Sequence, residues 1–246
     1  MFLNGPAGRL AYRQQPGRDP GLLFLPGFMS DMTGEKATRL GALSASRGHH
    51  YVALDYSGHG ASDGRIEEGT ITRWLADVLA VLDAVCPPRV VLAGSSMGGW
   101  LALLAARARP ERVAALLGIA AAPDFTERLV WHTLSPGERE TMMREGLLRV
   151  PSAYGGDQVF SRALIEDGRQ HLLLDGPIAI RCPVRLVHGQ RDPDVPWETA
   201  LAIADRLQGP DVRTVLVKDG EHRLSRPSDL ALIERLVVEL LGENGA

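Results

Sequence analysis

Short apolar runs alternate with longer amphipathic segments along the chain. The expected strands span 10–14, which would be the first and outer one, and then 22–25, 51–55, 90–93, 113–121, 184–188 and 212–217. Apolar side chains recur at helical spacing over 71–85, and further helices are expected over 100–107, 197–207 and 230–241. Strands separated by helices are typical of βαβ units. The pattern therefore predicts a mainly parallel twisted sheet with helices on both faces, the α/β-hydrolase class of fold.

One segment interrupts this alternation. Residues 124–176 contain no convincing strand, and Pro136 and Pro151 break their short helix-like bursts of apolar side chains. We expect one α/β domain over 1–246, with a small helical lid inserted at about 124–176. Some of the lid's apolar side chains seat it on the domain, and the others are expected to line a substrate pocket. The candidate pocket residues are Met29, Trp131, Leu134 and Met142.

Composition narrows the possible environments and partners. The net charge is −3 and the arginines are scattered singly, so a nucleic-acid partner is not expected. No apolar run approaches a membrane span, and the first residues lack the core of a signal peptide, which favours the cytoplasm. Cys86 and Cys182 are far apart and fit buried thiols better than a disulfide or a metal pair. Lysine occurs only at Lys36 and Lys218 beside abundant arginine, which hints at a bacterial genome rich in GC.

The stretch Gly94-Ser95-Ser96-Met97-Gly98 matches the GxSxG pattern of a serine nucleophile. It follows the apolar run 90–93 and precedes an expected helix, which is the strand–turn–helix context that the pattern requires. So sharp a turn needs small neighbours, and the two outer glycines supply them. Ser96 is therefore the expected nucleophile, whereas Ser95 occupies the variable position. The alternative, a glycine-rich phosphate cradle, lacks the lysine of a P-loop.

A serine hydroxyl needs a base, and in this fold the base is a histidine that comes after the acid in the chain. Of the seven histidines, His49, His50 and His59 precede Ser96, His132 and His171 fall in the lid, and His188 ends a strand. His222 alone follows every acid candidate, in a polar loop after the run 212–217. We therefore expect His222 to be the base. His188 fits a structural hydrogen bond better, and His59 a surface or pocket-lining position.

The acid is expected to be Asp192, which lies just past the strand 184–188. Its neighbour Asp194 and the earlier Asp124 remain alternatives. The backbone N–H groups of Met97 and of Phe28, in the Pro-Gly-Phe turn after the strand 22–25, are placed to form an oxyanion hole. No cluster with metal-ligand spacing accompanies these residues, so neither a metal nor another cofactor is expected.

With these motifs in place, the sequence resembles the palmitoyl-protein thioesterase and acyl-glucuronide esterase family, a mitochondrial enzyme and its bacterial relatives. The resemblance extends almost from end to end, through 24–28, 32–37, 55–64, 94–100, 187–189, 195–197 and His222-Arg223. It implies a triad of Ser96, Asp192 and His222 and a small-molecule or protein-linked acyl substrate. The lid shows little detailed agreement.

Three functions from different classes remain open at this point. A serine esterase or thioesterase that forms an acyl-enzyme on Ser96 fits the motifs best. A carbon–carbon bond hydrolase or lyase can use the same triad, and a non-catalytic ligand-binding member of the fold would not need it. The sequence sets no oligomeric state beyond an expected monomer or weak homo-oligomer.

Overall fold

A computed structural model describes residues 1–151 and 156–242. The described chain forms an eight-stranded sheet in the order β1-β2-β4-β3-β5-β6-β9-β10. The strands are β1 Phe2–Gly5, β2 Gly8–Gln15, β3 Arg18–Leu25, β4 His49–Leu54, β5 Val90–Ser95, β6 Val113–Ile119, β9 Val184–Gly189 and β10 Val212–Val217. Pairing is parallel from β4 through β10, while β1 and β2 are antiparallel at one edge. The predicted fold class is confirmed.

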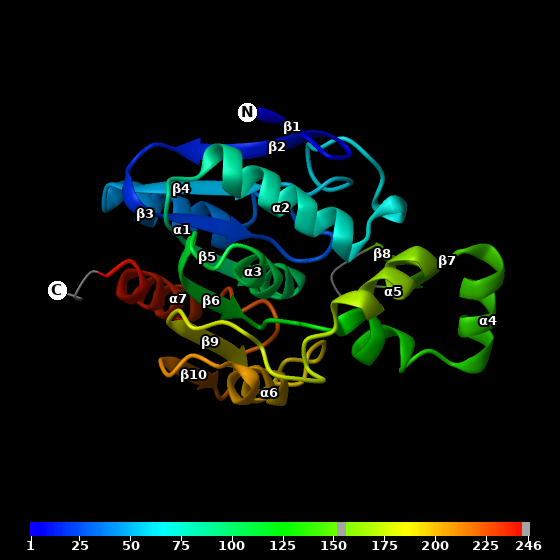
Figure 1. The fold of residues 1–246 in the computed structure, drawn as a ribbon. Coiled ribbons are helices and arrows are strands. Elements are labelled where there is room, and N and C mark those ends of the chain that lie inside the picture. Colours follow the sequence, from blue (N-terminus) through cyan, green and yellow to red (C-terminus); the bar gives the residue numbers. More distant parts are fainter. Residues whose placement is uncertain (152–155, 243–246) are drawn as a thin grey trace.

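Helices cover both faces of the sheet (Figure 1). They are α1 Glu35–Ser46, α2 Ile71–Val85, α3 Met97–Ala108, α6 Glu198–Arg206 and α7 Pro227–Leu240. Along β3, Leu23 and Leu25 join the core under α2, α3 and α6, whereas Leu22 and Phe24 join the core under α1 and α7. Both sets are buried because successive side chains of a strand point to opposite, covered faces. This explains why the central strands are continuous apolar runs.

Two elements of this domain were missed in the sequence. The strand 10–14 is not the first one, because β1 lies outside it and pairs Phe2 with Ala11. Helix α1 was not predicted, since polar side chains interrupt its apolar positions and only four of its residues are buried. No helix among the described residues is long and apolar enough to cross a membrane.

The insertion between β6 and β9 differs from the all-helical lid that was expected. It contains a π-helical turn Thr126–Trp131, α4 Pro136–Glu145, α5 Arg162–Gly168, and a short 3₁₀ turn Arg169–His171. It also contains an antiparallel hairpin, β7 Leu147–Pro151 with β8 Asp157–Ser161. The expectation of no strand in 124–176 was therefore wrong. Two five-residue strands pairing only with each other carry too short an alternation to stand out from a helical burst. In Figure 1 these elements lie beyond the ends of the central strands.

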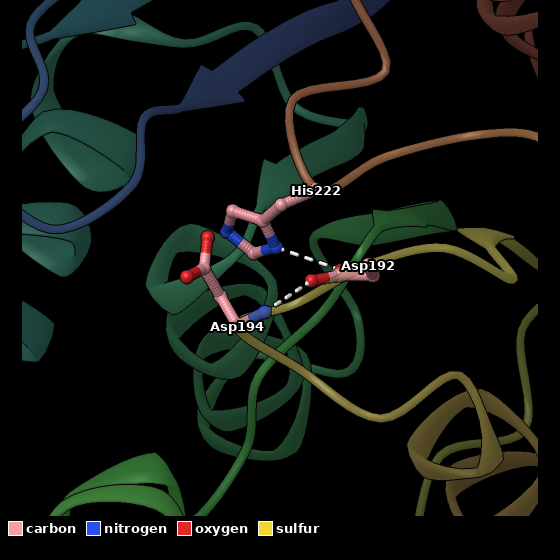
Figure 2. A group of neighbouring side chains, drawn as sticks. All are labelled: Asp192, Asp194 and His222. Carbon is pink, nitrogen blue, oxygen red and sulfur yellow. Dashed lines mark hydrogen bonds and ion pairs between the residues drawn. The ribbon is translucent and has the colours of Figure 1, made fainter. Parts of the chain in front are cut away.

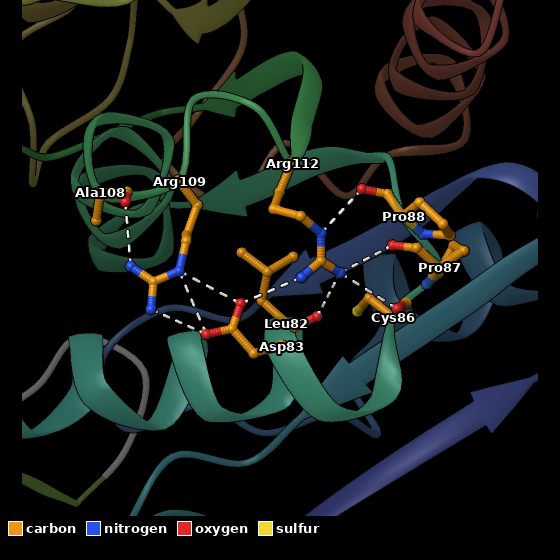
Figure 3. A network of polar contacts seen from close by, with 8 residues as sticks. All are labelled: Leu82, Asp83, Cys86, Pro87, Pro88, Ala108, Arg109 and Arg112. Carbon is orange, nitrogen blue, oxygen red and sulfur yellow. Dashed lines mark hydrogen bonds and ion pairs between the residues drawn. The ribbon is translucent and has the colours of Figure 1, made fainter.

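The side chain of Arg112 caps the carboxyl end of α2 with a cluster of hydrogen bonds (Figure 3). The guanidinium of Arg112 donates to the carbonyl oxygens of Leu82, Cys86, Pro87 and Pro88 at 2.8–3.3 Å, and to Asp83 at 3.2 Å. These carbonyls lack backbone donors because they lie at a helix end and because the two prolines have no N–H. Cys86, whose carbonyl accepts from Arg112, is a half-buried free thiol, and burial raises the pKa of this thiol to about 12. Cys182 is also a free, half-buried thiol.

Candidate active site

Ser96 sits on a strained turn between β5 and α3. Its φ of 55° lies in the left-handed region, and its N–H and carbonyl are fixed by Ile119 O at 2.9 Å and Ala122 N at 3.1 Å. A Cβ at Gly94 would come within 2.1 Å of Gly98 O, so both glycines are needed for the turn. The turn presents the Ser96 hydroxyl at the end of the sheet, where it lines a cavity.

His222 reaches Ser96 from the loop after β10. Its Nε2 lies 3.1 Å from Ser96 Oγ, and its Nδ1 lies 2.8 Å from Asp192 Oδ2. Because an ionised carboxylate only accepts, Nδ1 carries the proton and Nε2 is free to accept the serine proton. Three residues that are far apart in the sequence thus form one hydrogen-bonded line: acid, imidazole and hydroxyl.

The carboxylate of Asp192 is fully buried, and both of its oxygens are hydrogen-bonded. Its Oδ1 accepts from Asp194 N and Val195 N at 2.8 and 2.9 Å, and its Oδ2 accepts from His222 and from His188 Nε2 at 3.1 Å. Burial opposes ionisation of this carboxyl. The hydrogen bonds from His188 and His222 outweigh burial and hold its pKa well below the usual range. Asp192 is therefore ionised whenever the imidazole is able to act as a base.

His188 has the structural role that the sequence favoured. It is fully buried, and its Nε2–H is shared between Asp192 Oδ2 and Val195 O at 3.0 Å. Its Nδ1 has no partner among the described residues. His188 thus holds the same Asp192 oxygen that accepts from His222.

Neither alternative acid takes the place of Asp192. Asp194 is exposed, its N–H donates to Asp192 Oδ1, and a carboxylate oxygen lies within 4.8 Å of Asp192 and His222 ligand atoms. Asp124 is buried at the base of the insertion, where its oxygens accept from Leu173 N and Leu174 N at 2.8 and 2.9 Å. Burial raises the pKa of Asp124 even though these bonds lower it. Asp124 therefore joins the first and last parts of the insertion and does not hold the imidazole.

Two backbone donors face the same cavity as Ser96. Met97 is the first residue of α3, and Phe28 follows Pro26-Gly27 at the end of β3. Neither N–H has an acceptor among the described residues. The chain also passes close to Ser96 here, because a Cβ at Gly27 would lie 3.4 Å from Ser96 Cβ. The arrangement suits an anionic oxygen bound beside the serine.

The cavity measures about 740 Å³, and its lining changes from the insertion to the rest of the domain. The insertion side is mainly apolar, with Phe125, Leu129, Val130, Leu134, Val150 and Phe160 beside Thr133, Asp157 and Gln158. The Phe28 and Phe160 rings stack with centroids 5.4 Å apart, so the insertion packs directly on the Phe28 turn. The rest of the domain adds most of the charged lining residues, which are Asp31, Glu35, Lys36, Asp194 and Arg223. Burial and the neighbouring Arg223 lower the pKa of Lys36 to about 8, and its ammonium donates to Arg223 O beside His222.

The candidate pocket residues divide into two pairs. Met29 and Leu134 line the cavity, as expected. Trp131 and Met142 do not. The ring of Trp131 lies between the guanidiniums of Arg139 and Arg169, at 5.3 and 5.0 Å, and Met142 is wholly buried in the core of the insertion. The sequence analysis missed Phe125 and Phe160, because the stretches around them are too short to give a periodic signal.

Asp192, Asp194 and His222 also form a group whose side-chain ligand atoms lie within 4.8 Å of one another (Figure 2). Such a group resembles part of a cation site. The oxygens of Asp192 already accept four hydrogen bonds, and both nitrogens of His222 are engaged. A cation would have to displace the Asp192–His222 bond, so we assign this group to hydrogen bonding.

Known proteins share both the sequence and the architecture. A model described as the alpha/beta hydrolase family matches residues 22–231. The mitochondrial palmitoyl-protein thioesterase ABHD10 of Mus musculus is 41% identical over 243 residues, which cover 98% of this chain and 82% of that protein. The Homo sapiens protein of the same name is 39% identical over 98% of this chain and 79% of its own length.

Two solved structures agree with this result. Alpha/beta hydrolase domain-containing protein 10 from mouse has a TM-score of 0.91 at 40% identity, and a putative hydrolase from Agrobacterium vitis S4 has 0.95 at 39%. Each match covers 98% of both chains. The resemblance drawn from the motifs is confirmed, and the chain belongs to the alpha/beta hydrolase family.

Proposed function

We propose that this enzyme hydrolyses thioester or ester bonds of acyl substrates through an acyl-enzyme on Ser96. The observation that carries the proposal is the line Ser96–His222–Asp192, with bonds of 3.1 and 2.8 Å, at the wall of a cavity that is apolar on one side. The mouse and human relatives bear the name palmitoyl-protein thioesterase. That name and the apolar lining both support an acyl group as the part of the substrate that is bound.

In the proposed reaction, Ser96 Oγ attacks the acyl carbonyl carbon while its proton passes to His222 Nε2. The carbonyl oxygen becomes an oxyanion, which the N–H groups of Phe28 and Met97 stabilise. When the tetrahedral intermediate collapses, the bond to sulfur or oxygen breaks and His222 gives its proton to the leaving group. A water molecule then loses a proton to His222 and attacks the acyl-enzyme. The products are a carboxylic acid and a thiol or alcohol, and Ser96 regains its proton.

The insertion at 124–176 is proposed to be the lid of this site. Phe125, Leu134 and Phe160 supply apolar surface from it, and each buried methylene of an acyl chain contributes about 0.8 kcal/mol. A medium-length or longer acyl chain is therefore the expected substrate, in preference to an acetyl group. The leaving group, whether a protein thiol or a small alcohol, would lie at the polar side near Asp194 and Arg223.

The experiment is a series of straight-chain p-nitrophenyl esters and matched thioesters, from acetyl upward, hydrolysed by the native enzyme and by Ser96→Ala. We expect kcat/KM to rise with chain length for both bond types and to fall by about 10⁴-fold or more in Ser96→Ala, with an unchanged Tm. Full turnover by Ser96→Ala would contradict the proposal. An inactive native protein that binds acyl chains would favour a non-catalytic member of the fold.

Other properties stay predictions from the sequence: a cytoplasmic location, a bacterial origin, no nucleic-acid partner, and a monomeric or weakly self-associating state. The described residues supply no helix able to span a membrane. The names of the mouse and human relatives place those proteins in mitochondria.

A further inference from the structure

The turn that carries Phe28 has an unusual backbone. Met29 follows with φ of 55°, a strained value for a residue with a side chain, and the turn is closed by Ser30 N donating to Gly27 O at 3.1 Å. Phe28 N–H is left without a protein acceptor among the described residues, whereas the next N–H, that of Met29, is bound. The direction in which Phe28 N–H points therefore depends on what holds Met29.

The N–H group of Met29 is held by a histidine. His59 Nε2 accepts from Met29 N at 3.1 Å, and on the other side of the ring Nδ1 lies 3.3 Å from Ser57 O. A carbonyl oxygen only accepts, so Nδ1 carries the proton and Nε2 offers its lone pair to Met29. The ring is 4% exposed, and burial lowers its pKa to about 4. His59 is consequently neutral, and able to accept from Met29, throughout the neutral pH range.

Aromatic rings fix the orientation of this imidazole. Phe28, Tyr56 and Trp74 each present an edge or face to it, with centroids 6.2, 5.4 and 5.2 Å away. The segment that carries His59 is tied to the same turn a second time, because Asp55 accepts from Met32 N at 2.7 Å and from Ala61 N at 2.9 Å. His59 is thus a buried, fixed residue and not a surface one, and it lines only a smaller cavity next to the turn.

The turn borders two cavities. Met29, Ser30 and Asp31 line the large cavity beside Ser96, and the same three residues line a second cavity of about 200 Å³. Gly58, His59, Gly60 and Ile66 complete this second cavity. Cavity space next to these residues reduces the packing that keeps the strained backbone in place, so directed hydrogen bonds must do so.

We propose that His59 is a positioning residue of the oxyanion hole: by accepting from Met29 N–H, it keeps the turn in the one conformation that aims Phe28 N–H at the carbonyl oxygen bound beside Ser96. The proposal rests on the proposed function, because an oxyanion forms only if Ser96 attacks a carbonyl. His59 itself touches neither substrate nor Ser96. Its effect is therefore expected in the transition state and hardly in ground-state binding.

The test compares two substitutions of similar volume. His59→Gln retains an oxygen that can accept from Met29 N–H, whereas His59→Met fills the space without a strong acceptor. His50→Ala is the control, since His50 is also a buried histidine but lies at the amino end of β4 and bonds to Gln14, not to the turn. The measurements are kcat and KM for one p-nitrophenyl acyl ester and the inhibition constant of an acyl trifluoromethyl ketone, which forms an oxyanion on the serine.

We expect His59→Met to lose about 10- to 100-fold in kcat with KM changed less than about threefold, and the ketone to bind weaker by the same factor. His59→Gln should recover most of both losses, and His50→Ala should match the native enzyme. The proposal is overturned if His59→Met keeps native kcat, if Gln and Met variants lose activity equally, or if kcat falls without weaker ketone binding. Absence of ester hydrolysis in the native enzyme would instead defeat the proposed function.

Discussion

In the parallel sheet, Ser96, Asp192 and His222 follow the carboxyl ends of the strands β5, β9 and β10, whereas most of the apolar cavity lining comes from an insertion of short, irregular elements. The sheet places its side chains through the fixed geometry of β5, β9 and β10. The insertion places Phe125 and Phe160 through a π-helical turn and a two-stranded hairpin. Chemistry is thus carried by the regular part of the molecule and substrate shape by the irregular part.

The largest expected effect concerns the regular part. Asp192→Asn should lower kcat/KM by about 10³- to 10⁴-fold, because an amide cannot hold the imidazole tautomer or stabilise its charged form. Asp194→Asn should change kcat/KM less than about fivefold, since Asp194 is exposed and the acceptor for His222 Nδ1 is Asp192. Steady-state kinetics of the two variants test this prediction. A larger loss of kcat/KM in Asp194→Asn than in Asp192→Asn would make Asp194 the acid.

The residues of the regular part were identifiable because their chemistry is local. The glycines that flank Ser96, the histidine after the last strand and the aspartate after β9 can each be recognised from their neighbours in the sequence. His188 and His59 were visible too, but their partners, Asp192 and Met29, are brought near only by folding. The residue type alone does not show whether an imidazole will be exposed to solvent or packed against a strained turn.

The irregular part was predicted less well for a physical reason. Trp131 and Met142 are large and apolar, and hydrophobicity alone placed them in the pocket. Trp131 instead lies between two guanidiniums, and Met142 fills the interior of the insertion. Apolar residues in a short, non-periodic segment can face the cavity or the segment's own core, and tertiary packing decides between the two.

A second prediction uses the buried imidazole of the regular part. The pKa of His59 is about 4 when folded, below the ordinary value of 6.5, so the unfolded chain takes up this proton first as the pH falls. The stability that neutral His59 contributes is complete above pH 6.5 and is lost as the pH falls through 4, by up to about 3 kcal/mol. Urea unfolding at several pH values should show a shallower acid loss in His59→Gln. Parallel curves would show that His59 is not buried neutral.

A third prediction concerns the joint between the two parts. Asp124→Asn removes one of the acceptors for Leu173 N and Leu174 N, which should cost about 1–3 kcal/mol. The loss should appear as faster hydrogen exchange at the amides of 173 and 174, while exchange in β5 and β6 stays native. Equal acceleration throughout the sheet would mean that the insertion and the sheet unfold as one unit.

The smallest effect sharpens the role of the insertion in substrate choice. Leu134→Ala and Phe160→Ala should flatten the dependence of kcat/KM on acyl chain length, since each buried methylene is worth about 0.8 kcal/mol, or about fourfold. Trp131→Ala should leave the dependence as it is, because its ring contacts arginines outside the cavity. If only Trp131→Ala flattened the dependence of kcat/KM on acyl chain length, the acyl chain would not bind beside Leu134 and Phe160.

The covalent intermediate gives the most direct test of the central claim. The native enzyme is mixed with a p-nitrophenyl acyl ester, quenched in acid within the first turnovers, digested, and mapped by mass spectrometry. The account predicts a mass increase of one acyl group less one hydrogen on the peptide containing Ser96, fragmenting to Ser96 itself, and no such adduct in Ser96→Ala. An acyl group on Ser95 or on any other side chain would contradict the account. So would rapid release of p-nitrophenol without any acyl adduct on a serine.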